Sequence, residues 1–269
     1  MTFDQTHWAP RRQTRPLPTF YYHEHFVEML DFVMSHYAHA LLEAHVRFAD
    51  DFRALPREAQ CLYVRLVNRK GRVFARNRIR YPELGSSGPL VAELQRAGWV
   101  GQPDASHFDD VLGFLTRAEI YDVVLARIAG VARSMKKVEL VAFVREQLDP
   151  VEFMAALDTD RILVQRRVEA VRYILFLYFG RIRDSLSQFT MRDLGLVRTQ
   201  SFHDTYEPRF SDREEALEHY YYASRLSAAR DLQADALAST AAGVADWPTP
   251  NFPGSTGLRD ELAFKLGRM

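Results

Sequence analysis

The residues best suited to chemistry in this sequence are the basic side chains between positions 65 and 80. No acidic residue interrupts that stretch, and all but one of its cations are arginines: Arg65, Arg69, Lys70, Arg72, Arg76, Arg78 and Arg80. Arginine suits phosphate because its planar guanidinium can donate two parallel hydrogen bonds. The stretch therefore predicts a phosphate-binding surface, and the alternative interpretation is a solvated basic face.

Two further basic groups follow along the chain. The first lies around an expected break between two helices, and its lysines open the second helix, where backbone N–H groups can also meet a phosphate: Arg127, Arg133, Lys136 and Lys137. For the second we favour structural ion pairs with acids such as Glu169 and Asp184: Arg161, Arg166, Arg167, Arg172, Arg181 and Arg183. Lys plus Arg and Asp plus Glu both number 35, so any basic face must be local.

Other chemistries find little support in the residue patterns. The single cysteine, Cys61, excludes a disulfide framework and a cysteine-based zinc site. An early group of histidines lacks metal-ligand spacing, which favours structural roles: His23, His25, His36, His39 and His45. No nucleophile elbow or phosphate-binding P-loop occurs, and Gly85–Gly88 reads as a turn. Pro103-Asp104 resembles the start of a metal-dependent nuclease centre, but no Glu-x-Lys follows it.

The elements around the basic stretch have the order of a winged-helix module. Residues 1–18 predict a flexible arm, and the apolar spacing predicts a helical region over 21–53 and a helix over 57–69 that ends with Gly71 in the position after its C-cap. An extended segment over 73–81, a helix over 90–96 and a short strand at Trp99-Val100 follow.

The rest of the chain predicts mostly helices. Helices over 115–128 and 136–148 flank a break, and Thr116 with Glu119 forms a capping box. We expect almost continuous helix over 151–194, and another helix over 212–237 capped by Ser211 with Glu214. Residues 246–257 read as a loop before a last helix over 258–266.

Four stretches, taken in order, resemble the N-terminal region of the Fanconi-associated nuclease family. The members of this family are structure-selective nucleases of the VRR-NUC type. They are Phe52–Pro56 with the run from Leu62 to Tyr81, Leu115–Val144 with Lys136-Lys137 at its second helix, Ile174–Gly180 with Met191–Val197, and Arg209–Glu215.

This resemblance implies a mainly α fold with a helical and winged-helix-like region, a SAP-like helix–extended–helix module and a C-terminal helical region. The corresponding expected domains are 1–18 (arm), 19–110, 111–149, 150–240 and 241–269. It also implies a region that grips branched or 5′-flap duplex DNA in interstrand-crosslink repair. Carried onto this sequence, the expected DNA contacts are Arg69, Lys70, Arg72, Arg76, Arg78, Arg80, Lys136 and Lys137, to which the adjacent Arg133 is added.

In that family a C-terminal metal-dependent domain cleaves the DNA, acting as an endonuclease and 5′ exonuclease. We expect no cofactor in this chain, and we expect Mg²⁺ or Mn²⁺ to bind in the missing nuclease domain. That nuclease domain is also an expected partner, either in cis or in trans. We also expect a cytoplasmic protein that DNA binding associates with the nucleoid, without membrane contact. Two alternatives stay open: a helical scaffold for an acidic protein partner, and a phosphodiesterase with an unrecognised metal site.

Overall fold

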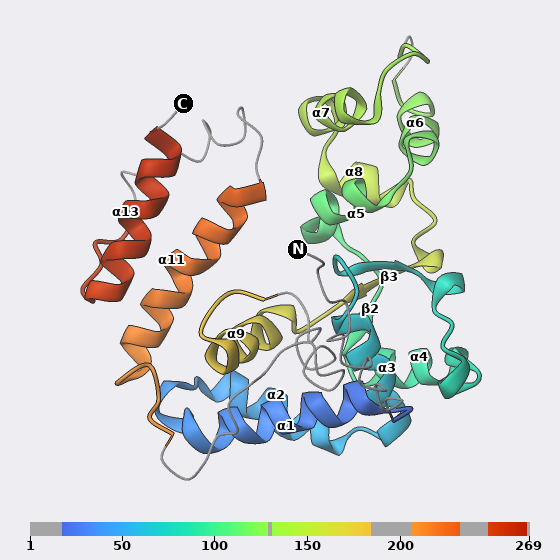
Figure 1. Ribbon diagram of the computed structural model, residues 1–269. Helices are drawn as coiled ribbons and strands as arrows, with labels where there is room; N and C mark the ends of the chain where they lie inside the picture. Colours follow the sequence, from blue (N-terminus) through green and yellow to red (C-terminus); the bar gives the residue numbers. More distant parts are fainter. Residues whose placement is uncertain (1–17, 129–130, 184–205, 232–246, 268–269) are drawn as a thin grey trace, which may run out of the picture.

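The structure is a computed structural model that describes residues 18–128, 131–183, 206–231 and 247–267. The fold is mainly α, as predicted (Figure 1). The predicted arm over 1–18, apart from Pro18, lies outside the described residues, as do the predicted helical segments over 184–194 and 232–237. No helix in the described part of the chain is both long and apolar enough to cross a membrane.

The first helical region is two helices rather than one continuous run over 21–53. α1 (Tyr21–His36) and α2 (Glu43–Ala54) are separated by a 3₁₀ turn at Ala38–Ala40 and an extended pair, Leu41 and Leu42. The break has a local cause, because the Leu42 N–H donates to Nδ1 of His45 at 3.1 Å and so starts α2 afresh.

The third helix, α3 (Arg57–Val67), begins directly after Pro56, as the sequence predicts. It ends earlier than expected, with Asn68 as its C-cap, and the Asn68 amide donates back to the Val64 carbonyl at 3.0 Å. Gly71 therefore does not follow the C-cap directly. Its φ of +77° serves the tight turn that leads from the helix into the first strand.

A small antiparallel sheet lies between the helices. Its strands are β1 (Val73–Ala75), β3 (Ile162–Gln165) and β2 (Val100–Gly101), in the order β1-β3-β2, and Val73 pairs with Val164. The extended segment predicted over 73–81 is a strand only as far as Ala75, and a 3₁₀ turn follows at Arg76–Arg78. The prediction of helix through 151–194 is wrong at β3, which is the central strand.

The two faces of the sheet belong to two different hydrophobic cores. Phe74 and Leu163 point into the first core, which is also lined by α1, α2, α3, α4 (Ser87–Arg96) and α9 (Val168–Phe179). Val73 and Val164 point into the second core. Alternate side chains of a strand face opposite sides, so two neighbouring residues on β1 and two on β3 join the two cores.

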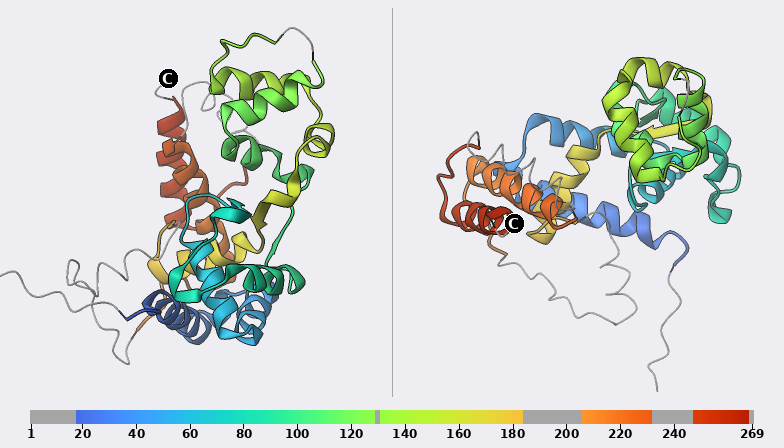
Figure 2. Two further views of the ribbon diagram at one scale, coloured as in Figure 1. Left: turned by 90° about the vertical axis from the view of Figure 1, so that its right-hand side faces the viewer. Right: turned by 90° about the horizontal axis from the view of Figure 1, so that it is seen from above.

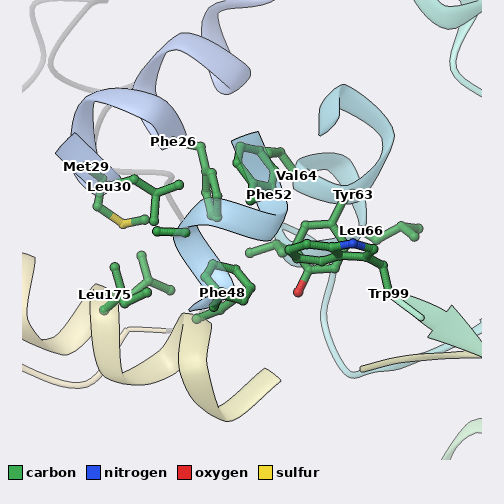
Figure 3. Close-up of a cluster of buried hydrophobic side chains, with 14 of the residues drawn as sticks. Phe26, Met29, Leu30, Phe48, Phe52, Tyr63, Val64, Leu66, Trp99 and Leu175 are labelled. Atoms are coloured by element: carbon green, nitrogen blue, oxygen red, sulfur yellow. The ribbon is translucent and has the colours of Figure 1, made fainter. Parts of the chain in front are cut away.

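The first core combines aromatic and aliphatic side chains (Figure 3). Trp99, just before β2, is 1 % exposed, and its ring centroid lies 4.6 Å from that of Tyr63 and 5.2 Å from that of Phe48. Edge-to-face packing of this kind adds to the free energy gained by burying the rings. The core thereby holds α2, α3 and the β2 edge of the sheet in fixed positions.

The second core contains the predicted helix–extended–helix module and the short helices on either side of it: α5 (Phe108–Phe114), α6 (Arg117–Leu125), α7 (Lys137–Gln147) and α8 (Pro150–Ala155). The predicted capping box at the start of α6 is present, since Glu119 N–H donates to Oγ1 of Thr116 at 3.3 Å and the Glu119 carboxylate accepts from Thr116 N–H at 2.7 Å. In Figure 1 and the left view of Figure 2, α6 and α7 lie at the opposite end of the molecule from α1 to α4.

The last described part of the chain is α9 followed by a pair of helices: α9 (Val168–Phe179), α11 (Arg213–Asp231) and α13 (Pro253–Gly267). α9 ends at Phe179, and its C-cap is Gly180, whose φ is +68°. The predicted cap of α11 is displaced by one residue, because Asp212 accepts from the Glu215 N–H at 2.9 Å and Glu215 accepts from the Ser211 N–H at 2.7 Å. α13 begins at Pro253, inside the predicted loop, because proline is well suited to the first turn of a helix.

Candidate nucleic-acid interface

The predicted basic stretch forms the turn after α3, strand β1 and the 3₁₀ turn that follows. We call residues 68–80 the basic turn. Arg69 closes it on itself, since its Nη2 donates to the Arg78 carbonyl at 3.2 Å. The Arg69 guanidinium also lies 5.7 Å from the ring centroid of Phe74 and 5.5 Å from that of Tyr81. These contacts hold the turn in one shape, so its other side chains project from a fixed frame.

Three cations of the basic turn are exposed: Lys70, Arg78 and Arg80. Among the described residues, none of their side chains has a hydrogen-bond partner or a carboxylate within ion-pair distance. Unpaired, exposed guanidinium and ammonium groups keep their full donor capacity for an anion in solution. These three residues are therefore the strongest phosphate-binding candidates of the basic turn.

Other cations of the stretch have partners within the protein. Arg65 pairs with Glu83 and stacks 3.9 Å from the ring centroid of Tyr22. The pKa of Glu83 lies below its ordinary value, because its hydrogen bonds from the backbone and from Arg65 outweigh the effect of burial, which raises it. The Arg65 side chain is therefore engaged in an internal ion pair with Glu83 and is not free to bind a phosphate.

Arg72 and Arg76 are also engaged. Arg72 donates to the Asp110 carboxylate, with Nε at 2.8 Å. Arg76 donates through Nε to the Asp160 carbonyl at 3.1 Å and through Nη2 to the side chain of Gln95 at 3.1 Å. Both were predicted as DNA contacts from the sequence. Both join the basic turn to neighbouring elements, and the partners of Arg76 are uncharged groups, so its positive charge is not offset.

The second predicted group lies on and between α6 and α7, at the surface around the second core. Arg133 and Lys136 are exposed, and their side chains have no partner within the described part of the chain. Lys137 differs, because its Nζ donates to the Gly113 carbonyl at 2.8 Å and so fastens the start of α7 to the end of α5. The turn before α7 is held by Arg117, which donates to the carbonyls of Arg133 and Met135.

The third basic group is largely internal, as predicted for it. Arg172 pairs with Glu169 at 3.2 Å. Arg161 pairs with Glu119 at 2.6 Å, and Arg167, the one non-glycine residue with positive φ among those described, pairs with Asp51 and stacks 4.4 Å from the Trp99 ring centroid. The predicted partner Asp184 lies outside the described residues.

Sequence reasoning did not associate Arg172 with the basic turn. The structure brings them together, because Arg172 of α9 and Gln165 of β3 line a pocket of about 180 Å³ together with Arg69, Lys70 and Arg72. The chain separation between the basic turn and Arg172 hides this proximity. The available signal in the sequence is the high density of arginines around α9, which by itself favours structural ion pairs.

Comparisons with known proteins agree with this architecture. Residues 20–101 match the family described as FAN1, HTH domain. The chain is 24 % identical over 252 residues to the Fanconi-associated nuclease 1 homolog of Pseudomonas aeruginosa, and 28 % identical over 193 residues to that of Oryza sativa subsp. japonica. Those matches cover 93 % and 66 % of this chain but only 44 % and 20 % of the relatives. The chain therefore spans less than half the length of either.

Two solved structures of paFAN1 share the fold. One is a complex with 2-nt 5′-flap DNA with a gap, and it aligns with a TM-score of 0.72 at 23 % identity over 94 % of this chain and 46 % of that one. The other is a complex with 1-nt 5′-flap DNA with a gap, and it aligns with a TM-score of 0.73 over 93 % of this chain. These comparisons confirm the predicted resemblance to the Fanconi-associated nuclease family.

Proposed function

Because this chain matches Fanconi-associated nuclease homologues over most of its length, we propose that it is a DNA-binding region of a flap nuclease. It grips the duplex part of branched or 5′-flap DNA through the phosphates. The observation that carries the proposal is the set of exposed cations on the basic turn, Lys70, Arg78 and Arg80, whose side chains have no partner among the described residues and which lie within the segment that matches the FAN1 HTH family. Such contacts position a protein on DNA without reading its sequence.

Arg133 and Lys136 at the other end of the molecule supply a second contact. Two separated cationic sites on a rigid frame favour an extended anionic partner such as a duplex. They favour a small anion less, because it would meet only one of them. The sheet that both cores share keeps the two sites at a fixed separation, which lets the chain distinguish DNA shapes by geometry.

Cleavage belongs in this proposal to a separate nuclease domain, in cis or in trans, which would hold Mg²⁺ or Mn²⁺. Within the described residues, no three His, Cys, Asp or Glu side chains gather where they could hold a metal ion. The residues therefore do not fit such a metal, and we derive no metal-dependent step for this chain. In the proposal this region binds and orients the DNA.

The proposal is tested by fluorescence anisotropy with a labelled 5′-flap duplex between about 50 and 300 mM salt. Each phosphate contact contributes about 0.9 to the slope of log K against log salt concentration, so R78A/R80A should lower the slope by about 2. The affinity should fall by about tenfold or more at low salt. R47A is the matched control, because Arg47 lies on α2 with its side chain 69 % exposed and outside both sites.

A flat salt response of the wild-type chain, or equal loss in R47A and R78A/R80A, would contradict the proposal. Binding to dextran sulfate of the same strength as to flap DNA would instead favour a scaffold for an acidic partner. Sustained cleavage of labelled flap DNA with Mn²⁺, abolished by EDTA, would place the chemistry in this chain.

A further inference from the structure

α9 is buried on nearly every side, and its first turns open to solvent at one place. Glu169 and Arg172 are exposed there, whereas the residues from Tyr173 to Tyr178 are all buried. Arg172 lines two pockets at this opening. One is the pocket of about 180 Å³ next to the basic turn, and the other is a pocket of about 490 Å³ between α9 and α11.

The larger pocket combines flat aromatic rings with cations. Tyr220 and Tyr221 line it from α11, and the guanidinium of Arg225 lies 3.5 Å from the ring centroid of Tyr221. Among the residues that the structure describes, no carboxylate pairs with Arg225. Tyr220 is held by an edge-to-face contact with Tyr173 at 5.1 Å, so this wall is rigid. Ser224 and Ser227 also line this pocket.

We propose that the two pockets form one track for a single strand of nucleic acid, which leaves the basic turn, crosses Arg172 and places a base against Tyr221 and Arg225. The proposal rests on the proposed function and assigns to this track the unpaired strand of the DNA. Aromatic and guanidinium faces bind unpaired bases by stacking, while cations between them follow the phosphates. Lys70, Arg172 and Arg225 supply those cations along the track.

The shape of the site favours a single strand over a duplex. A volume of about 490 Å³ lies in the range of small-ligand pockets and admits a nucleotide unit. A duplex is too wide to enter it, and a base exposes its face for stacking on Tyr221 only when it is unpaired. The duplex would therefore stay on the basic turn while an unpaired strand continues into the pocket.

Among the described residues that line the two pockets, Glu169 is the one whose carboxylate opposes an anion. It pairs with Arg172 at 3.2 Å, and the two side chains are 75 % and 50 % exposed. An exposed ion pair three residues apart on a helix contributes little and is easily exchanged. A phosphate can take over Arg172 with two hydrogen bonds, which are stronger because both partners are charged. Removing the charge of Glu169 should therefore strengthen binding of a single strand.

The experiment compares the full chain with four variants on fluorescein-labelled oligo(dT), on a blunt duplex and on a 5′-flap duplex. We expect Y221A/R225A to bind oligo(dT) about tenfold more weakly, as loss of base stacking predicts, with blunt-duplex affinity unchanged within about twofold. E169Q should bind oligo(dT) more tightly, by about twofold. R213A is the matched control, because Arg213 is exposed on the same helix outside the pocket.

Y221F keeps the ring and is expected to bind oligo(dT) like the wild-type chain, which separates stacking from a folding defect. Unchanged oligo(dT) affinity in Y221A/R225A, or an equal loss in R213A, would overturn the track. If one of these two results is found while the wild-type chain still binds blunt duplex with a steep salt dependence, the single-strand track is wrong and the proposed function stands. If no DNA binds at all, the proposed function fails with it.

Discussion

Arg72 and Asp110 fasten the basic turn to the second core, with Nε of Arg72 donating to Oδ2 of Asp110 at 2.8 Å and Nη2 donating to the same oxygen. Arg72 directly precedes Val73, whose side chain is part of that second core. The pair therefore holds the first residues of β1 against α5. A side chain that the sequence assigns to DNA thus has a structural role.

We expect R72A to lower the free energy of unfolding by about 1 kcal/mol, because the pair is partly exposed and joins two elements. Urea unfolding of the wild-type chain, R72A, D110A and the double variant measures this as a double-mutant cycle. The salt slope of DNA binding should change less in R72A than in R78A. A coupling energy near zero between Arg72 and Asp110, together with a full loss of DNA affinity in R72A, would show instead that Arg72 contacts the DNA.

The neighbours Lys136 and Lys137 should differ in phenotype. Lys136 is exposed and unpartnered among the described residues, whereas Lys137 binds the Gly113 carbonyl at 2.8 Å. We expect K136A to weaken flap-DNA binding and to lower the salt slope by about 1, with stability unchanged. K137A should mainly destabilise the fold, by about 1 kcal/mol, since it breaks the link between α7 and α5. Anisotropy and urea unfolding of both variants check this, and identical behaviour of the two would contradict it.

His45 should make the protein less stable in mild acid. Burial lowers its pKa from 6.5 to about 4, and its ring is stacked on Tyr173 with 4.5 Å between centroids. Between these values the unfolded chain takes up a proton that the folded chain does not. Stability is therefore fully present above pH 6.5 and falls until about pH 4, by at most about 3 kcal/mol from this residue.

Urea unfolding of the wild-type chain and H45N over this pH range measures the effect. H45N should show a smaller loss of stability between pH 6.5 and 4, although a residual slope remains because burial also lowers the pKa of His219. The same slope in both proteins would show that His45 is protonated in the folded state.

How far the sequence predicts the fold is clearest at β3. The helices are recognised from apolar residues three and four apart, as at α3 and α7. All four residues of β3 are buried, so the strand shows no alternation and reads as part of the apolar helical run around it. Its partners β1 and β2 precede it by more than 60 residues, as in the pair Val100 and Gln165. Only the tertiary pairing distinguishes it as a strand.

At the candidate interface, too, contacts between residues that are distant in the sequence are missed by sequence reasoning. Charge counting identifies the basic turn correctly as a cationic segment, because its cations are local in sequence. The groups that engage Arg65, Arg72 and Arg76 come from Glu83, Asp110 and Asp160, which lie 18, 38 and 84 residues away. No local window contains them. Sequence reasoning therefore overestimates the number of free cations.

The carboxylate of Glu119 links the second core to the sheet. Glu119 caps α6 and also accepts from Nη1 of Arg161 at 2.6 Å, one residue before β3. Hydrogen bonding from the Thr116 backbone, and then from Arg161, overcomes the opposing effect of burial and lowers the pKa of Glu119 from 4.5 to about 2. The carboxylate thus holds two elements together only while it is ionised.

A folded-state pKa below the unfolded value stabilises the protein above pH 4.5, and this stabilisation is lost as the pH falls towards 2. We expect E119Q to be less stable than the wild-type chain at pH 7 by about 1 kcal/mol, as for loss of a helix cap, and to approach it in stability near pH 2. Unfolding curves of both proteins at these pH values test this. E152Q, on the exposed side of α8, is the matched control and should follow the wild-type pH dependence, because Glu152 accepts no side-chain hydrogen bond among the described residues. If E119Q keeps the wild-type difference in stability between pH 7 and pH 2, the Glu119 carboxylate does not link α6 to β3.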